Sequence, residues 1–225
     1  MENDLGLSAG DTLGGHAQDR PRLRGWIHRV AMFTFPLLAA LVVVDAPNWF
    51  YRWPAIVFGV GMTGVFAVSS TFHLGDWAPK RYTLMRRLDH SMNSVAIAAG
   101  YTPFLAYCFS GSVRIALLVG YWALTAIVVG SRVLWITAPP KMVAASYLTL
   151  GWLGILLLPF VARRLTAEEL ALVFASAAFF SVGAWIYARE RPNPWPAVFG
   201  FHEVFHLLAL VGQVTLLYVV WLQFP

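Results

Sequence analysis

The sequence predicts an all-α integral membrane protein, a bundle of seven transmembrane helices with a cytoplasmic N-terminus and the C-terminus outside. The first observation is composition: the 225 residues are 59% hydrophobic and only 12% charged. A soluble domain has about 25% charged and about 45–50% apolar residues, so a soluble globular fold and a disordered chain are both excluded. The second observation is that the apolar residues fall into seven runs, each near the roughly 20 residues that a helix needs to span a bilayer.

The lengths of these runs favour helices over β-barrel strands, which need about 10 residues of alternating polarity. The expected helices cover residues 26–44, 53–73, 88–109, 113–131, 142–161, 170–188 and 199–224. Charges and turn-forming residues separate them in order at Asp45-Ala46-Pro47-Asn48, Ala78-Pro79-Lys80-Arg81, Ser110-Gly111-Ser112, Ala138-Pro139-Pro140-Lys141, Arg163-Arg164 and Arg191-Pro192-Asn193-Pro194. Residues 1–25 are polar and Gly-rich. They are expected to form a disordered cytosolic tail, and residues 26–225 a single membrane domain.

The distribution of Lys and Arg predicts the orientation. With the tail and every second loop assigned to one side, that side holds 12 of the 16 basic residues. By the positive-inside rule this side is cytoplasmic, which indicates a multi-pass protein of the cytoplasmic membrane. The basic residues are scattered between apolar runs and do not form the single basic face that nucleic-acid binding requires, so no nucleic-acid partner is expected.

The few polar residues converge on the same cytoplasmic side. Ionisable groups in or beside membrane spans are functional candidates, because burying them unpaired is costly. Those expected at one depth are His28, Ser69, His73, Asp89, His90, His202 and His206. Residues far apart in the sequence are thus predicted to lie close together.

The spacing of His202 and His206 predicts a metal site. Residues at i and i+4 lie on one face of a helix, and two imidazoles there can share a zinc ion. His73, at the end of its helix, supplies a third nitrogen. Three histidines leave the fourth zinc position open, as in catalytic sites. Asp89 is the expected proton acceptor, and Ser69, one turn before His73, is expected to hold a water or substrate oxygen.

Three other interpretations compete with this one. The histidine pair can be interfacial, with its rings reaching the headgroups, and Ser69 can be a helix-packing hydroxyl. The segment 202–206 also matches the H-E-x-x-H pattern of zinc metalloproteases, in which the glutamate is the base. On a helix, however, Glu203 points about 100° away from the His202 side, and no histidine or acidic residue follows His206 to serve as a third ligand.

Residues 59–64 match the G-x-G-x-x-G pattern of dinucleotide-binding sites. They lie inside an unbroken apolar run, whereas the dinucleotide motif needs a strand-to-helix turn. Small residues that let membrane helices approach closely are the better explanation.

Four separated motifs now point to a family. They are Ser69-Ser70-Thr71-Phe72-His73, Arg86-Arg87-Leu88-Asp89-His90-Ser91, Gly100-Tyr101-Thr102-Pro103-Phe104 and His202-Glu203-Val204-Phe205-His206. In order and spacing they resemble the hemolysin III family, the bacterial branch of the progestin and adipoQ receptor (PAQR) superfamily. The resemblance covers about residues 20–222. Arg24-Gly25-Trp26 stands in place of the E-x-x-N element that many members have before the first helix, and Leu217 stands where many bacterial members have a further histidine.

The resemblance implies seven helices, a cytoplasmic N-terminus and a zinc ion bound by His73, His202 and His206. It assigns the water-orienting aspartate to Asp89 and the serine to Ser69. Relatives with demonstrated chemistry resemble ceramidases. The leading hypothesis is therefore a zinc-dependent intramembrane hydrolase of a lipid-like amide or ester. The alternative is a non-catalytic membrane sensor or membrane-perturbing factor in which zinc only holds helices together.

Overall fold

A computed structural model describes residues 20–135 and 140–225, and every regular element within them is helical. The helices are α1 (Trp26–Asp45), α2 (Trp49–Leu74), α3 (Pro79–Cys108), α4 (Gly111–Leu134), α5 (Pro140–Trp152), the 3-10 helix η2 (Leu153–Leu157), α6 (Leu158–Val161), α7 (Ala167–Arg189) and α8 (Phe201–Leu222). The expected tail falls largely on residues 1–19, which lie outside the described residues, as do residues 136–139.

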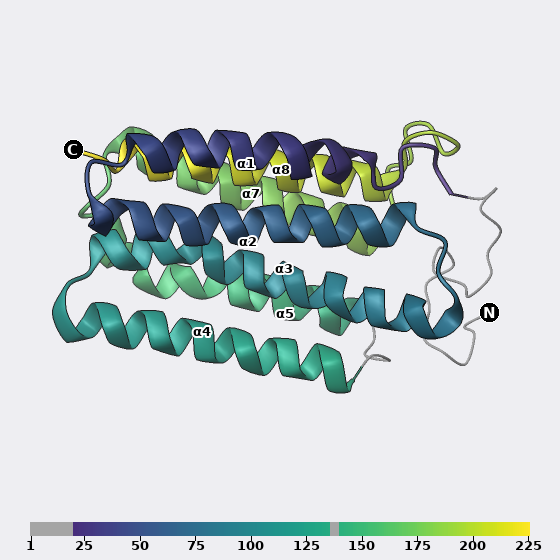
Figure 1. Cartoon of the computed structure of the whole chain (residues 1–225), viewed down its shortest axis with the longest axis horizontal. Helices are drawn as coiled ribbons and strands as arrows, with labels where there is room; N and C mark the ends of the chain where they lie inside the picture. The colour runs from purple at the N-terminus through teal and green to yellow at the C-terminus, as the bar shows by residue number, and fades with distance from the viewer. Residues whose placement is uncertain (1–19, 136–139) are drawn as a thin grey trace.

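The long helices run side by side along the long axis of the molecule (Figure 1). α2 packs against α1 and α3, α4 packs on α3, and α8 packs on both α7 and α1. Phe35 of α1 and Phe58 and Phe66 of α2 form the main core, together with Leu217 of α8. Leu217 is 4% exposed. The position at which the resemblance leads one to expect a further histidine is therefore apolar core in this chain.

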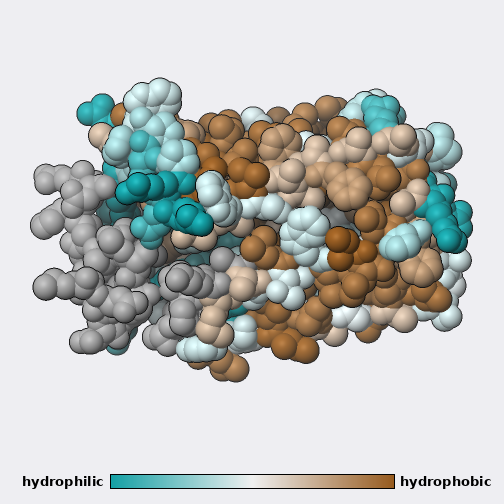
Figure 2. All heavy atoms as spheres, turned by 180° about the vertical axis from the view of Figure 1, so that it is seen from behind, coloured by the Kyte–Doolittle hydropathy of each residue, from teal (hydrophilic) through white to brown (hydrophobic). Residues whose placement is uncertain are grey.

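Within the described residues, five helices are long and apolar enough to cross a membrane by length and composition, namely α1, α2, α4, α7 and α8. Large apolar side chains are exposed along them, such as Leu41 at 68% and Ile127 at 69%. Figure 2 shows hydrophobic residues over the middle of one face, with hydrophilic residues gathered toward its two ends. A broad exposed apolar surface is suited to lipid and unfavourable in water. The chain is an all-α membrane protein.

α3 begins earlier than the sequence predicts, at Pro79 in place of residue 88. Proline is favoured in the first turn of a helix, where its missing N–H has no intrahelical partner to lose. No glycine or proline follows before residue 88, so the helix continues through the basic residues Lys80, Arg81, Arg86 and Arg87. The prediction from hydrophobicity therefore covered only the apolar part of this helix, from residue 88, and missed its polar first turns.

The run expected as one helix over residues 142–161 is interrupted by η2. Pro159 follows this tight turn, and a proline ring clashes with the carbonyl four residues earlier, which disfavours continuous α-helix. Tyr101 of α3 packs into the break: its hydroxyl donates to the Gly151 carbonyl, and a Cβ on Gly154 would overlap the Tyr101 ring.

α2 ends, and α1 and α8 begin, at the same end of the bundle (Figure 1). We call it the histidine end, after His73 on α2 and His202 on α8. Residues 20–25, which precede α1, lie beside the α7–α8 connection there. The N–H groups of Arg22 and Leu23 donate to the carbonyls of Ala197 and Val198, each at 3.0 Å. The start of α1 is thus fixed to the connection that leads into α8.

Candidate metal centre

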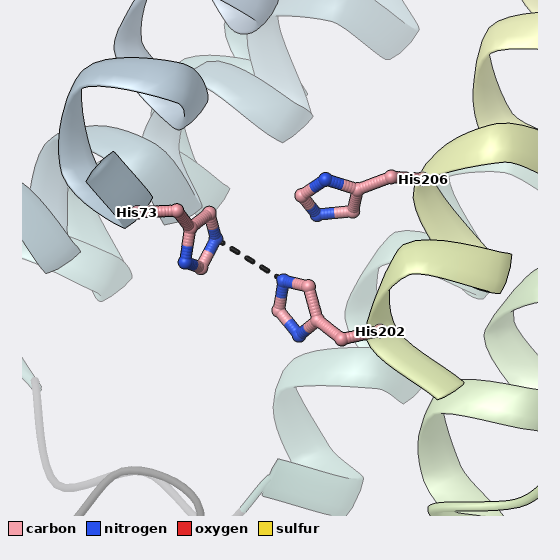
Figure 3. Close-up of side chains that lie close together, drawn as sticks. All are labelled: His73, His202 and His206. Atoms are coloured by element: carbon pink, nitrogen blue, oxygen red, sulfur yellow. Dashed lines mark hydrogen bonds between the residues drawn. The ribbon is translucent and has the colours of Figure 1, made fainter. Parts of the chain in front are cut away.

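Two helices supply the predicted ligands. His73 is the penultimate residue of α2, and His202 and His206 lie in the first two turns of α8. Their i, i+4 spacing places both α8 imidazoles on one face, and the three rings face one another in Figure 3. His202 and His206 are buried, and His73 is half-buried. The predicted convergence of three histidines is confirmed.

The distances between the rings fit a shared ion. The Nε2 atoms of His73 and His202 are 3.1 Å apart, and one donor nitrogen from each of the three residues lies within 4.8 Å of the others. Two nitrogens bound to tetrahedral zinc at about 2.0–2.1 Å lie about 3.3 Å apart. Small rotations of the rings would complete such a site. Imidazole nitrogens suit zinc, copper, iron and nickel, so the donor set fits a transition metal.

His28 of α1 adds a fourth imidazole beside the cluster. Its ring stacks on His206 with centroids 3.9 Å apart and planes 6° from parallel. An imidazole would bind a metal through a lone pair in its own ring plane, and two stacked parallel rings do not direct their lone pairs at one point. His28 is therefore not placed to share an ion that His206 would hold. It is 5% exposed, and neither ring nitrogen has a hydrogen-bond partner among the described residues.

Glu203, between the two α8 histidines, is engaged elsewhere. Its Oε1 pairs with Nε of Arg24 at 2.6 Å, and its Oε2 accepts from the N–H of Gly200 at 2.8 Å, which caps α8. The side chain is 1% exposed. Because both carboxylate oxygens are already bound, Glu203 is poorly suited to be the base that the metalloprotease alternative requires.

The other predicted site residues are buried on neighbouring helices. Ser69 lies on α2, one turn before His73, and is 2% exposed, while Asp89 lies on α3 and is 7% exposed. The donor atoms that converge on one point, within the described part of the chain, belong to the three histidines and not to Asp89 or His90. The catalytic roles of Asp89 and Ser69 therefore stay predictions.

Two contacts at the site were not foreseen from the sequence. The stack of His28 on His206 joins α1 to α8, and the ion pair of Arg24 with Glu203 joins the short segment before α1 to α8. The sequence signal was limited to a histidine and an arginine near the expected first helix. Which partner each takes depends on how α1 packs against α8, and a single sequence does not give that packing.

Comparison with known proteins gives a consistent result. The family model described as "Haemolysin-III related" matches residues 16–217. The chain is 32% identical over 186 residues to "Heptahelical transmembrane protein ADIPOR2" of Oryza sativa subsp. japonica, covering 73% of this chain and 79% of that protein. It is 27% identical over 195 residues to "Hemolysin-3 homolog" of Bacillus subtilis, covering 84% and 86%. It is 30% identical over 167 residues to "Hemolysin-3" of Bacillus cereus, covering 73% and 72%.

The family model spans nearly all of the described helices and includes the three histidines. The matched segments cover 79% and 86% of the length of two of these proteins, so the similarity extends over a whole membrane domain. The chain belongs to the haemolysin III family of the progestin and adipoQ receptor superfamily.

Proposed function

We propose that this protein is a zinc-dependent intramembrane hydrolase that cleaves an amide or ester bond of a lipid-like molecule, in the manner of a ceramidase. The observation that supports it most is the convergence of His73, His202 and His206 at one end of an apolar bundle. A three-histidine set leaves one zinc position for water or substrate. Zinc at such a site supplies Lewis-acid activation of a carbonyl group and of water.

The remaining chemistry falls to side chains near this end. Asp89 accepts the proton of the attacking water and returns it to the leaving nitrogen or oxygen. Ser69 donates a hydrogen bond to the substrate carbonyl oxygen, where negative charge develops. Water is added across the C–N or C–O bond, so the products are a carboxylic acid and an amine or alcohol. Both residues are buried, as groups acting on a substrate inside the bundle must be.

The substrate class follows from the surroundings of the histidines. The long helices expose apolar side chains on their outer faces, which supports a substrate that carries an acyl chain and enters from the bilayer. In such a substrate, the amide or ester bond next to the acyl chain would lie at the same depth in the membrane as the three histidines. The partners are the bilayer and a lipid-like small molecule, with no nucleic acid.

For topology we propose seven spans, with α3 and the interrupted segment 140–161 crossing in addition to the five apolar helices. One similar protein is named heptahelical. The histidine end faces the cytoplasm, because the tail and loops on that side contain 12 of the 16 basic residues. Residues 1–25 form a cytosolic tail, residues 26–225 the membrane domain, and the protein resides in the cytoplasmic membrane.

One observation favours the non-catalytic alternative. The contact between His73 and His202 joins the end of α2 to the start of α8, so an ion bound there also holds two helices together. In that case the protein is a membrane sensor or a membrane-perturbing factor, and zinc serves only stability. Two similar proteins are named hemolysins.

Metal analysis of the purified protein in detergent tests the site first. We expect about one zinc per chain in the wild type and a loss of at least about tenfold in zinc affinity in His73→Ala, because one of three ligands is removed. His16→Ala is the matched control, since this histidine precedes the membrane domain. A wild type that binds no transition metal would reject the site.

Hydrolysis of a ceramide-type lipid then separates the enzyme from the alternative. We expect Asp89→Asn to keep zinc and to lower turnover by about 10²–10⁴-fold, the usual contribution of a general base. Glu203→Gln, assayed with zinc in saturating excess, is expected to keep measurable turnover. Normal turnover in Asp89→Asn, or no turnover of amide and ester lipids by the zinc-loaded wild type, would contradict the proposed enzyme. Loss of activity only in Glu203→Gln would favour the protease-like assignment.

A further inference from the structure

Three residues of the segment 24–28 contact the histidine cluster or a residue next to it: Gly25 lies against His73, His28 stacks on His206, and Arg24 pairs with Glu203, which follows His202. We propose that this segment is a positioning element of the metal site, holding the three ligands in a binding arrangement from the N-terminal side. The inference rests on the proposed metal site. It adds Arg24, Gly25 and His28 as residues that act through the ligands and do not themselves bind the ion.

The first contact is the ion pair between Arg24 and Glu203. Glu203 lies next to His202 and is nearly fully buried, and Arg24 is its charged partner at 2.6 Å. The same carboxylate caps α8 through the N–H of Gly200. A buried carboxylate without its cation is strongly unfavourable. Arg24 therefore fixes the first turn of α8, the turn from which His202 projects.

The second contact is between Gly25 and His73. A Cβ atom on Gly25 would lie 3.0 Å from the Cβ of His73 and 3.1 Å from the Cγ of Leu74. The backbone of Gly25 thus lies directly against the last turn of α2. Since Gly25 has a positive φ of 79°, glycine satisfies both the conformation and the close approach.

The third contact is the stack of His28 on His206, with parallel rings 3.9 Å apart. Phe66 of α2 also contacts the His28 ring in an edge-to-face arrangement, with ring centroids 5.1 Å apart. The His206 ring is thereby held in one orientation, and the orientation of a ligand ring decides whether its lone pair points at the ion. Each of the three ligands thus has a neighbour within residues 24–28, either in direct contact or one residue away along the chain.

The two residues just before this segment are also held in place. The N–H groups of Arg22 and Leu23 donate to the carbonyls of Ala197 and Val198 in the α7–α8 connection. The positioning element is therefore bound both to the backbone before α8 and to the side chains on α8. We infer that the ligands on α2 and α8 keep their spacing because both helices contact this one piece of chain.

The test measures zinc affinity, by competition with a chelator, together with the thermal stability of the metal-free protein. The variants are Arg24→Gln, Glu203→Gln and the double variant. Arg24→Gln is expected to weaken zinc binding about 10–100-fold, the usual effect of a residue that orients a ligand. The double variant is expected to recover most of this loss, because the buried charge is gone and two amides can bond to each other.

Glu169→Gln is the matched control. Glu169 is also a buried glutamate that caps a helix, accepting from the N–H of Thr166 at 2.6 Å. It bonds to Gln223 after the end of α8, away from the histidine end. We expect this variant to lose stability with zinc affinity unchanged. If Arg24→Gln and Glu203→Gln behave like Glu169→Gln, with lower stability and wild-type zinc affinity, the ion pair is merely structural and the proposal is wrong.

Substitution of His28 provides a second, independent arm should Arg24→Gln fail to fold. His28→Phe keeps a flat ring on His206 and should keep zinc affinity within about threefold, whereas His28→Leu should lower it about tenfold or more. Equal affinities in the two variants would contradict positioning by the stack. A wild type without zinc binding would instead reject the metal site itself, so the two failures are distinguishable.

Discussion

Gly25 lies where the start of α1 meets the end of α2, and its substitution separates backbone strain from contact with a ligand. Gly25→Ala places a side chain at φ 79°, which costs about 1–2 kcal/mol, and brings its Cβ to 3.0 Å from that of His73. We expect lower stability and weaker zinc binding, measured by thermal unfolding and chelator competition.

Gly111→Ala is the control for this substitution. Gly111 also has a positive φ, of 57°, but a Cβ there would meet nothing within 4 Å. Its alanine variant should therefore lose a similar amount of stability and keep its zinc affinity. If the two variants lose equal stability and both keep wild-type zinc affinity, Gly25 has no influence on His73.

At the scale of single residues, the sequence predicted the three metal ligands, but it did not predict which residues contact those ligands. His202 and His206 could be paired from spacing alone, because an i, i+4 pair on a helix shares a face whatever the tertiary structure. His73 could be added because an expected helix ended there at the same depth. The partners of Arg24 and His28 could not be assigned, since they depend on how α1 packs on α8. Asp89 and Ser69 are buried as residues of a site would be, and their roles await the activity measurements.

At the scale of the helices, the glycines of residues 59–64 pack α2 against its neighbours. A Cβ on Gly59 would lie 2.8 Å from that of Ala39 on α1, and one on Gly61 only 2.3 Å from that of Ala99 on α3. This close packing agrees with the helix-packing interpretation of the motif. The positions of the apolar helices were predictable because a span needs about 20 apolar residues. The polar start of α3 and the turn η2 were not, since neither changes the apolar pattern.

Gly61→Ala tests this packing. In an open helical position alanine is more favourable than glycine by about 1 kcal/mol. Here we expect a loss of about 1–3 kcal/mol, because α2 and α3 must move apart. Thermal unfolding in detergent measures the effect. Gly120→Ala on α4, where a Cβ meets nothing within 4 Å, should be neutral or stabilising. A stable Gly61→Ala variant would show that the interface between α2 and α3 can adapt.

For the whole molecule, the histidines of the described residues and most of the basic residues gather at the same end. The connection between α2 and α3 and that between α7 and α8 both lie at the histidine end (Figure 1). The bundle therefore has one end that contains the histidines and most of the basic residues, and a second end that contains few basic residues. The positive-inside rule predicts orientation from this uneven distribution of basic residues. Because the histidines lie at the basic end, the orientation of the chain also decides which side of the membrane the histidines face.

Cysteine labelling in intact bacterial cells tests that orientation. The chain has one cysteine, the buried Cys108, so Cys108→Ala gives a background without cysteine. Lys80→Cys is exposed at the start of α3 near the histidine end, and Ser112→Cys is exposed at the start of α4 at the opposite end. A membrane-impermeant maleimide should label Ser112→Cys in intact cells and Lys80→Cys only after the cells are opened. Labelling of Lys80→Cys in intact cells would reverse the orientation and place the three histidines on the outer side.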